Sequence, residues 1–228
     1  MALRPAYRLT QHQGHRLVTG PAAEPVTLAE VRTLLRDPPA ADDDFIEDCI
    51  TQARMMFEAA TGIACINQTW KLTLNDWPGN VPEPTVSGYV EMPTTELYSG
   101  TATRDYVELP RYPLSSVSGI NVYDENDSAT AVTVNTVFFS DTQSFPGRLV
   151  LRFGQTWPVN TRRANGVEIT YVAGFGADAT TVPETIKLAI QRMAGYLYEN
   201  RGDGCSATAV FSGTGALQIA AEYVNVRL

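Results

Sequence analysis

One stretch of the sequence, DDDFIEDCITQARMMFEAATG at residues 42–62, specifies a helix together with both of its ends. Glu47 and Arg54 fall outside the stripe formed by its apolar residues, which recur at three- and four-residue spacing. Asp44 and Glu47 have the spacing of a capping box, the aspartates suit the positive end of the helix dipole, and Gly62 suits the left-handed position after a helix. The stripe that must be buried consists of Ile46, Cys49, Ile50, Ala53, Met56, Phe57 and Ala60.

A second amphipathic helix lies near the other end of the chain. Residues 181–184, TVPE, have the composition of a helix start, and residues 200–202, NRG, that of a helix stop. Its apolar face is Ile186, Ala189, Ile190, Met193 and Leu197. The two apolar faces can bury each other, so the sequence predicts a helical pair with a long insertion between its halves.

The insertion changes the hydrophobic period from 3.6 to 2. Trp70, Leu72 and Leu74 alternate with polar residues, as expected for a half-buried strand. Further strands are predicted at 106–109, 118–123, 132–139, 148–153 and 167–172, with a long Pro- and Thr-rich loop at 79–104 whose only strand candidate is 89–92. Short strands at this spacing indicate an antiparallel sandwich or small barrel.

The two ends of the chain have less regular patterns. Residues 1–24 are interpreted as an extended arm, with a disordered terminus as the alternative. A capping box at 27–30 opens a short helix that is stopped by Asp37, Pro38 and Pro39. Residues 202–215 have the composition of a loop, and Leu217, Ala220, Ala221 and Val224 recur at helical spacing after it.

These patterns predict an α+β fold, in which a bundle of three to four helices carries an inserted, β-rich antiparallel domain and extended arms at both ends. The expected divisions are 1–24 (N-terminal arm), 25–66 (first half of the helical part), 67–177 (β-rich insertion), 178–202 (second half of the helical part) and 203–228 (C-terminal loop and docking segment).

Composition excludes several classes of function. A formal net charge of −8 argues against a grip on nucleic acid, which requires clustered Lys and Arg. No apolar run reaches the roughly 20 residues that cross a bilayer, and the N-terminus lacks the apolar core of a signal peptide, so we expect synthesis in the cytoplasm and no membrane partner. The three cysteines show no metal-binding or disulfide pattern.

No motif indicates catalysis, a cofactor or a metal. The only histidines, His12 and His15, lie in the N-terminal arm, where a Ser–His pair would have no rigid support. The aspartates at 42–44 are explained by the helix N-terminus. Residues 124–128 begin like a calcium loop, but Ala129 and Asn135 stand where that loop needs Gly and Glu, so a turn is predicted. These residues name no reaction.

The order of several short segments resembles the head–tail connector family of tailed bacteriophages, which also has relatives in gene transfer agents. These segments cover most of residues 22–201. They are EPVTLAEV at 24–31 with LLR at 34–36, the helix at 42–62, QTWKL at 68–72, VELPRYPLSSV at 107–117, YD at 123–124, ITYVAGFG at 169–176, VPE at 182–184 and YLYENR at 196–201.

The resemblance implies a head-completion adaptor in the virion neck, a protein without enzymatic activity. Such proteins form a ring, typically dodecameric, beneath the portal protein, extend the channel through which genomic DNA passes, and present a platform for the next neck, stopper or tail protein. The expected portal-docking residues are Leu217, Ile219, Ala220, Tyr223 and Val224, and deleting 213–228 should leave a folded monomer that cannot join portal-bearing heads. The expected inter-subunit arm residues are Arg4, Tyr7, Arg8 and Leu9.

A β-sandwich recognition module of a phage particle is the alternative. In that interpretation Trp70, Trp77, Trp157 and Tyr112 would stack on a carbohydrate or receptor, although aromatic residues beside strands and prolines usually belong to a core.

Overall fold

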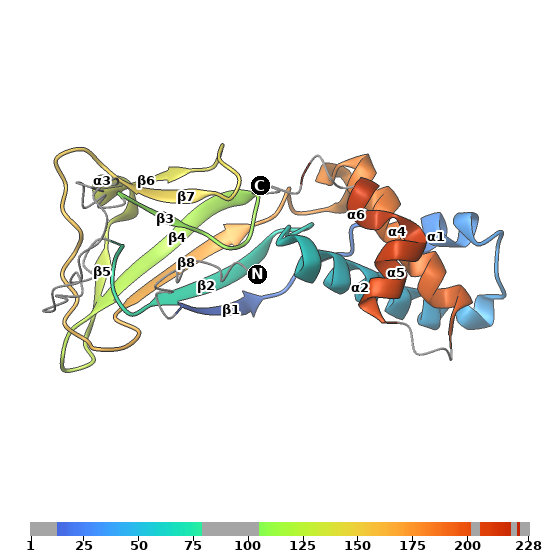
Figure 1. Cartoon of the computed structure of the whole chain (residues 1–228), viewed down its shortest axis with the longest axis horizontal. Coiled ribbons are helices and arrows are strands. Elements are labelled where there is room, and N and C mark those ends of the chain that lie inside the picture. Colours follow the sequence, from blue (N-terminus) through green and yellow to red (C-terminus); the bar gives the residue numbers. More distant parts are fainter. Residues whose placement is uncertain (1–12, 79–104, 202–205, 220–222, 224–228) are drawn as a thin grey trace, which may run out of the picture.

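The computed structural model describes residues 13–78, 105–201, 206–219 and 223, and it is elongated, with helices gathered at one end and strands at the other (Figure 1). We call these two parts the helical body and the β body. The helical body contains α1 (Leu28–Leu34), η1 (Ala40–Asp42), α2 (Asp43–Thr61), η2 (Ala179–Thr181), α4 (Glu184–Glu199), α5 (Ala207–Thr214) and α6 (Ala216–Ile219). The β body contains β1 (Gln13–Thr19), β2 (Gln68–Leu74), β3 (Tyr106–Glu108), β4 (Leu114–Tyr123), β5 (Ala129–Val132), α3 (Val134–Val137), β6 (Phe138–Asp141), β7 (Arg148–Leu151) and β8 (Val167–Ala173).

Helices α2 and α4 pack against each other and form the centre of the helical body. Their predicted apolar faces are largely confirmed, and the fully or almost fully buried members are Ile46, Cys49, Ile50, Ala53, Phe57, Ile186, Ala189, Ile190 and Met193. Gly62 ends α2 in the left-handed conformation, with φ 82°, as expected. Two expectations were wrong, because Ala60 is exposed and Arg54 is buried. The reason for the burial of Arg54 is a set of charged partners described below.

The start of α2 also differs from expectation. Asp42 occupies the N-cap position but its side chain makes no capping hydrogen bond, and no capping box forms with Asp44 and Glu47. The Asp42 carboxylate instead accepts hydrogen bonds from the Tyr198 hydroxyl and from Arg201 of the chain that follows α4. A tertiary contact has therefore replaced the local cap. The capping box of Thr27 and Glu30 at the start of α1 is confirmed.

Helix α5 lies within residues 202–215, which the sequence predicted to be a loop. The Ser206 hydroxyl caps it by accepting from the amide of Ala209, and Val210 is fully buried in the helical core. Its glycine is required by packing, since a Cβ on Gly213 would lie 2.6 Å from the Tyr196 ring. Gly213 thus permits close contact between α5 and α4, and Gly215 ends α5 in the left-handed conformation.

The β body contains two antiparallel sheets whose inner faces share one core. The larger sheet has the order β1-β2-β8-β4-β5 and the smaller one β3-β7-β6. The buried core residues alternate along β2 and β8, as the period of two predicts. The core side chains include Leu72, Leu74, Ile120, Ile169 and Tyr171 from the larger sheet and Val107, Phe138 and Leu149 from the smaller sheet.

The predicted strand at 132–139 was wrong. Here the chain completes β5, makes the single helical turn α3 and then starts β6. Val134 and Val137 stand three residues apart in α3, and both pack against the core of the β body, so they share a helical face instead of alternating across a strand. The remaining predicted strands are confirmed within a few residues, except for 89–92, which lies outside the described residues.

Strand β1 belongs to the chain's own sheet. Residues 13–19 were predicted to be part of an extended arm, and they are extended, but they pair with β2 from Gln13 opposite Leu74 to Thr19 opposite Thr69. Residues 13–19 are therefore engaged by their own sheet, and the predicted N-terminal arm is restricted to the residues before Gln13.

Candidate functional site

Three chain segments run between the two bodies, residues 20–26, 62–67 and 174–178, and the loop between β3 and β4, residues 109–113, reaches the helical body beside them. We call these four segments, in chain order, the first to fourth crossings, and the region where they meet the junction. Backbone hydrogen bonds tie these crossings to one another. The amide of Ala64 donates to the carbonyl of Tyr112 and the amide of Asn67 donates to the carbonyl of Gly176, each over 2.8 Å. The crossings therefore form a small ordered layer between the bodies.

A polar network lies inside the junction and centres on Arg54. Its guanidinium donates to Glu24 from Nε over 2.7 Å and to Glu58 from Nη1 over 3.1 Å. The other oxygen of Glu58 accepts from the amide of Cys65 over 2.9 Å and from the side chain of Gln68 over 2.8 Å. The network thus joins the segment before α1, helix α2, the second crossing and strand β2. A buried charge needs partners of this kind, because its desolvation is costly.

Two side chains of the third crossing, the loop between β3 and β4, satisfy the end of α2. A helix leaves its last carbonyl groups without intrahelical partners. Arg111 Nη1 donates to the carbonyl of Glu58, and the Tyr112 hydroxyl donates to the carbonyl of Thr61. The β body therefore caps the C-terminus of α2, which fixes the direction in which the helix leaves the sheet.

The fourth crossing depends on a glycine. Gly174 has φ +147°, and a Cβ there would lie 2.5 Å from the backbone nitrogen of Asn67. Its amide donates to the carbonyl of Pro113 over 2.9 Å. Both its conformation and the close approach of the second crossing exclude a side chain at this position.

An aromatic and cationic group borders the junction on the side of the β body. The His15 ring stacks on Trp70 with centroids 4.6 Å apart, and the Arg111 guanidinium lies 4.6 Å from the centre of the same indole. The Tyr171 hydroxyl accepts from the amide of Arg111 and lies 2.8 Å from His15 Nε2, to which it can donate. Burial, with a smaller contribution from the charge of Arg111, lowers the pKa of His15 to about 4.

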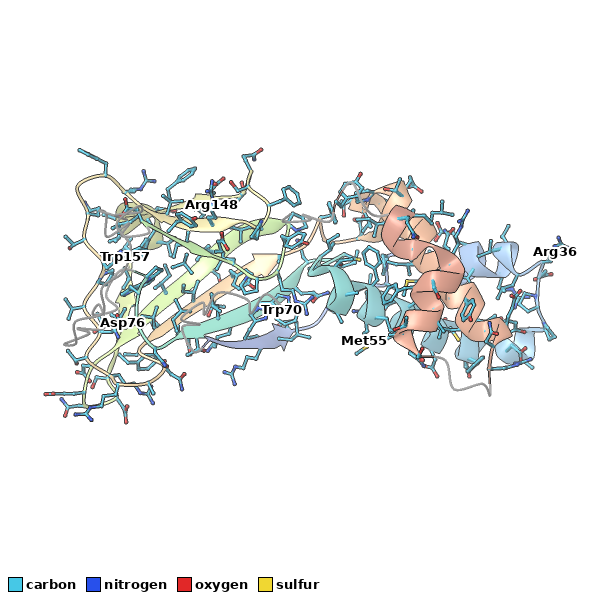
Figure 2. The ribbon with its side chains drawn as sticks, in the orientation of Figure 1. Arg36, Met55, Trp70, Asp76, Arg148 and Trp157 are labelled. Atoms are coloured by element: carbon cyan, nitrogen blue, oxygen red, sulfur yellow. The ribbon has the colours of Figure 1, made fainter. Side chains whose placement is uncertain are left out.

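Acidic and apolar side chains share the outer surface of the helical body. Asp44, Glu47 and Asp48 are exposed along the first half of α2, and none of them has an ion pair within the described residues. Met55, further along α2, is 58% exposed and projects from the molecule in Figure 2. This surface does not suit a polyanion, whose phosphates would be repelled.

The residues predicted to dock to another protein fall into two groups. Arg4, Tyr7, Arg8, Leu9, Ala220 and Val224 lie outside the described residues. Leu217 lies in α6, while Ile219 and Tyr223 pack against the helical core, where the Tyr223 ring meets the Phe175 ring edge-on at 6.2 Å. The C-terminal segment therefore lies on its own helical body, as far as the described residues extend.

The aromatic residues of the carbohydrate-binding alternative are used by the core and the junction. Trp70, Trp77 and Tyr112 are at least nine-tenths buried. Trp157 is partly buried and stacks on Trp77 with centroids 4.8 Å apart. Because each ring is covered by other side chains, these four residues do not form a platform for a sugar.

The remaining sequence candidates behave as structural elements. Asp124 Oδ1 accepts from the amides of Asn126 and Ser128, which makes the predicted turn. Within the described residues, no group of three or more His, Cys, Asp or Glu side chains is placed to hold a metal, and no helix is long and apolar enough to span a membrane.

Sequence reasoning missed the junction network. Arg54 and Glu58 have the i,i+4 spacing of a helical ion pair, which was an available signal. Their burial depends on Glu24 and Gln68, whose proximity to α2 only the folded chain reveals.

Comparisons with known proteins give structural but not sequence matches. No family model and no curated protein sequence matches the chain. A chain in the neck of an empty GTA particle, computed with C6 symmetry, superposes with a TM-score of 0.69 at 22% identity, covering 94% of this chain and 97% of that one. A chain in the neck of a native GTA particle, computed with C12 symmetry, gives 0.65 at 23% identity and the same coverage.

A chain in the virion of a native gene transfer agent (GTA) particle gives a TM-score of 0.64 at 21% identity, covering 88% of this chain and 94% of that one. The likeness spans both bodies and the junction. This chain therefore has the fold of those chains.

Proposed function

We propose that this chain is a structural protein of the neck of a phage-like particle, where it acts as a head–tail adaptor. Copies form a ring beneath the portal protein, extend the channel for the genome and provide the platform for the next neck or tail protein. The observation that carries the proposal is the likeness over nearly the whole length of both chains to proteins in gene transfer agent necks.

Ring formation is supported by the symmetry of those necks. One of them was computed with C12 symmetry and another with C6 symmetry, which is compatible with twelve copies around one axis. A closed ring needs a contact that joins two different surfaces of neighbouring copies. An elongated molecule with two bodies offers such surfaces along its length (Figure 1).

The junction supports a mechanical role. An adaptor must hold the surface that meets the portal at a fixed distance and angle from the surface that meets the tail. The polar network around Arg54 and the capping of α2 by Arg111 and Tyr112 fix these two surfaces relative to each other. A buried and fully hydrogen-bonded network also specifies one arrangement of the groups that it joins.

The charge supports passage of DNA without retention. The exposed acids of α2 and the formal net charge of −8, repeated around a ring, would repel the phosphates of a passing genome. We propose that the genome crosses the ring without specific binding, and that the C-terminal residues Leu217, Ile219, Ala220, Tyr223 and Val224 contact the portal protein.

The experiment is to delete the gene in a particle-producing cell and to image the particles by electron microscopy. We expect filled or emptied heads that carry portals but lack tails, with tails restored by the intact chain supplied in trans. Averaging the necks of the complemented particles with twelve-fold symmetry should reveal a ring of density into which the helical body and the β body of each copy fit. Normal tailed particles in the deletion strain would overturn the proposal.

A further inference from the structure

Helices α1 and α4 leave one apolar face of the helical body uncovered by any described residue. The side chain of Leu34 lies over Gly195, at 3.4 Å from the position of a Cβ there. Leu188, Arg192 and Gly195 stand four and three residues apart and therefore share one side of α4. Leu34 is 46% exposed and Leu188 is 38% exposed, so this α1–α4 face presents two leucines to the outside.

The α1–α4 face also carries unpaired positive charge. Arg192 and Arg36 are exposed, and neither has an ion pair within the described residues. Of the acids near this face, Glu30 closes the capping box of α1 and Glu184 pairs with Lys187 over 2.7 Å. Glu199, four residues after Gly195, is exposed, so among the described residues two arginines stand against one unengaged acid. A partner for this face should therefore combine an apolar side chain with carboxylates.

Helix α2 presents that combination on another side of the same body. Asp44, Asp48, Gln52 and Met55 are exposed and follow each other at three- and four-residue spacing, so they form one outward stripe of α2. The opposite stripe of α2 packs on α4. Figure 2 shows Met55 and Arg36 on different sides of the helical body, so one copy cannot join its own two surfaces.

We propose that the α1–α4 face of one copy binds the outward α2 stripe of a second copy, with Arg192 and Arg36 facing Asp44 and Asp48, and with Leu34 and Leu188 packing on Met55. The contact joins two different surfaces, so it repeats from copy to copy, and it forms a closed ring when the rotation between neighbours is a whole fraction of a full turn. This inference rests on the proposed function, because it names the contact by which the proposed ring is built. Charge complementarity and the exposed apolar side chains on both surfaces support it.

Charge reversal with rescue tests the contact in particles that contain the variant as their only source of the chain. Arg192→Glu and Asp48→Arg should each reduce incorporation of the chain into particles by about tenfold or more, and the double variant should recover most of it. Arg16→Glu and Glu125→Lys reverse exposed charges of the β body and should incorporate normally.

Cysteine cross-linking tests the pairing of the surfaces directly. The test uses a Cys205→Ser background, in which the two other native cysteines, Cys49 and Cys65, are buried. In this background Met55→Cys combined with Leu188→Cys should give a ladder of covalent oligomers when particles are treated with a short bis-maleimide. Each single cysteine variant should stay monomeric, because a contact between different surfaces never brings two copies of one residue together.

Three results would overturn the inference. The first is that a variant with one new cysteine forms covalent dimers. The second is that the variant with both cysteines enters particles but gives no ladder of oligomers. The third is that Arg192→Glu and Asp48→Arg are both incorporated normally. If the wild-type chain itself is absent from particle necks, the proposed function fails, and that outcome is distinct from the other three.

Discussion

Arg54 and Glu58 lie one turn apart on α2 and form an ion pair, with 3.1 Å between Nη1 and Oε2 and only 9% of each side chain exposed. Glu58 also accepts from Cys65 and Gln68, and Arg54 also donates to Glu24. The pair is thus the central part of the connection between the two bodies.

The first prediction concerns this pair. Glu58→Ala should lower the free energy of unfolding by about 3–5 kcal/mol, because it leaves Arg54 Nη1, the amide of Cys65 and the side-chain amide of Gln68 buried without their acceptor. Urea denaturation measures the loss. Glu47→Ala removes an exposed acid from the same helix and should change the free energy by no more than about 0.5 kcal/mol. Equal effects of the two substitutions would contradict the role given to Glu58.

The second prediction concerns the glycine of the fourth crossing. Gly174→Ala should destabilise the chain by about 3 kcal/mol or more, because the new methyl group adds a close contact with Asn67 to a backbone conformation that disfavours side chains. Gly119→Ala is the matched control, since a Cβ at Gly119 meets no atom within 4 Å. Thermal unfolding of both variants checks the difference, and a stable Gly174→Ala protein would show that the crossing can rearrange.

The third prediction concerns pH. The pKa of His15 is about 4 in the folded chain and 6.5 ordinarily, so the folded chain binds this proton less well than the unfolded chain does. Neutral His15 therefore contributes to the free energy of unfolding. This contribution is complete above pH 6.5, falls as the pH drops towards 4, and is lost below pH 4. His15→Gln cannot titrate, and its melting temperature should fall less between pH 7 and pH 4 than that of the wild type. Parallel pH profiles would count against this assignment.

The sequence was sufficient to locate a helix or strand where its local signals agree with the side that the fold buries. Helix α2 was located by its apolar spacing and by Gly62, and β2 by alternation that matches a face buried in one core. It was insufficient where distant residues decide the outcome. Asp42 looked like a capping residue, yet its carboxylate binds Tyr198, more than 150 positions later in the chain.

Helix α5 and strand β1 show the same limit. The glycines around α5 suggested a loop because the sequence does not reveal that Tyr196 lies against Gly213. Strand β1 was expected in an arm because its partner β2 follows only after two helices. The predicted docking and arm residues carry no comparable local signal, since a partner protein gives them their role, and they remain predictions.

The last prediction concerns the C-terminal segment. Deleting residues 213–228 was expected to leave a folded chain, but Ala216 is fully buried, and Ile219 and Tyr223 pack on the helical core. That deletion should therefore cost about 2–5 kcal/mol, as expected when large core side chains are removed, and would confuse instability with lost docking.

Deleting only residues 224–228 keeps every one of these contacts. Its urea midpoint should match that of the wild type, while its incorporation into portal-bearing heads should fall sharply if Val224 and its neighbours bind the portal protein. Incorporation is measured by mass spectrometry of purified particles, with the Glu125→Lys variant of the β body as a surface control outside the proposed contacts. A shortened chain that is both stable and fully incorporated would move the portal contact away from the C-terminus, to another surface of the helical body or to residues before Gln13.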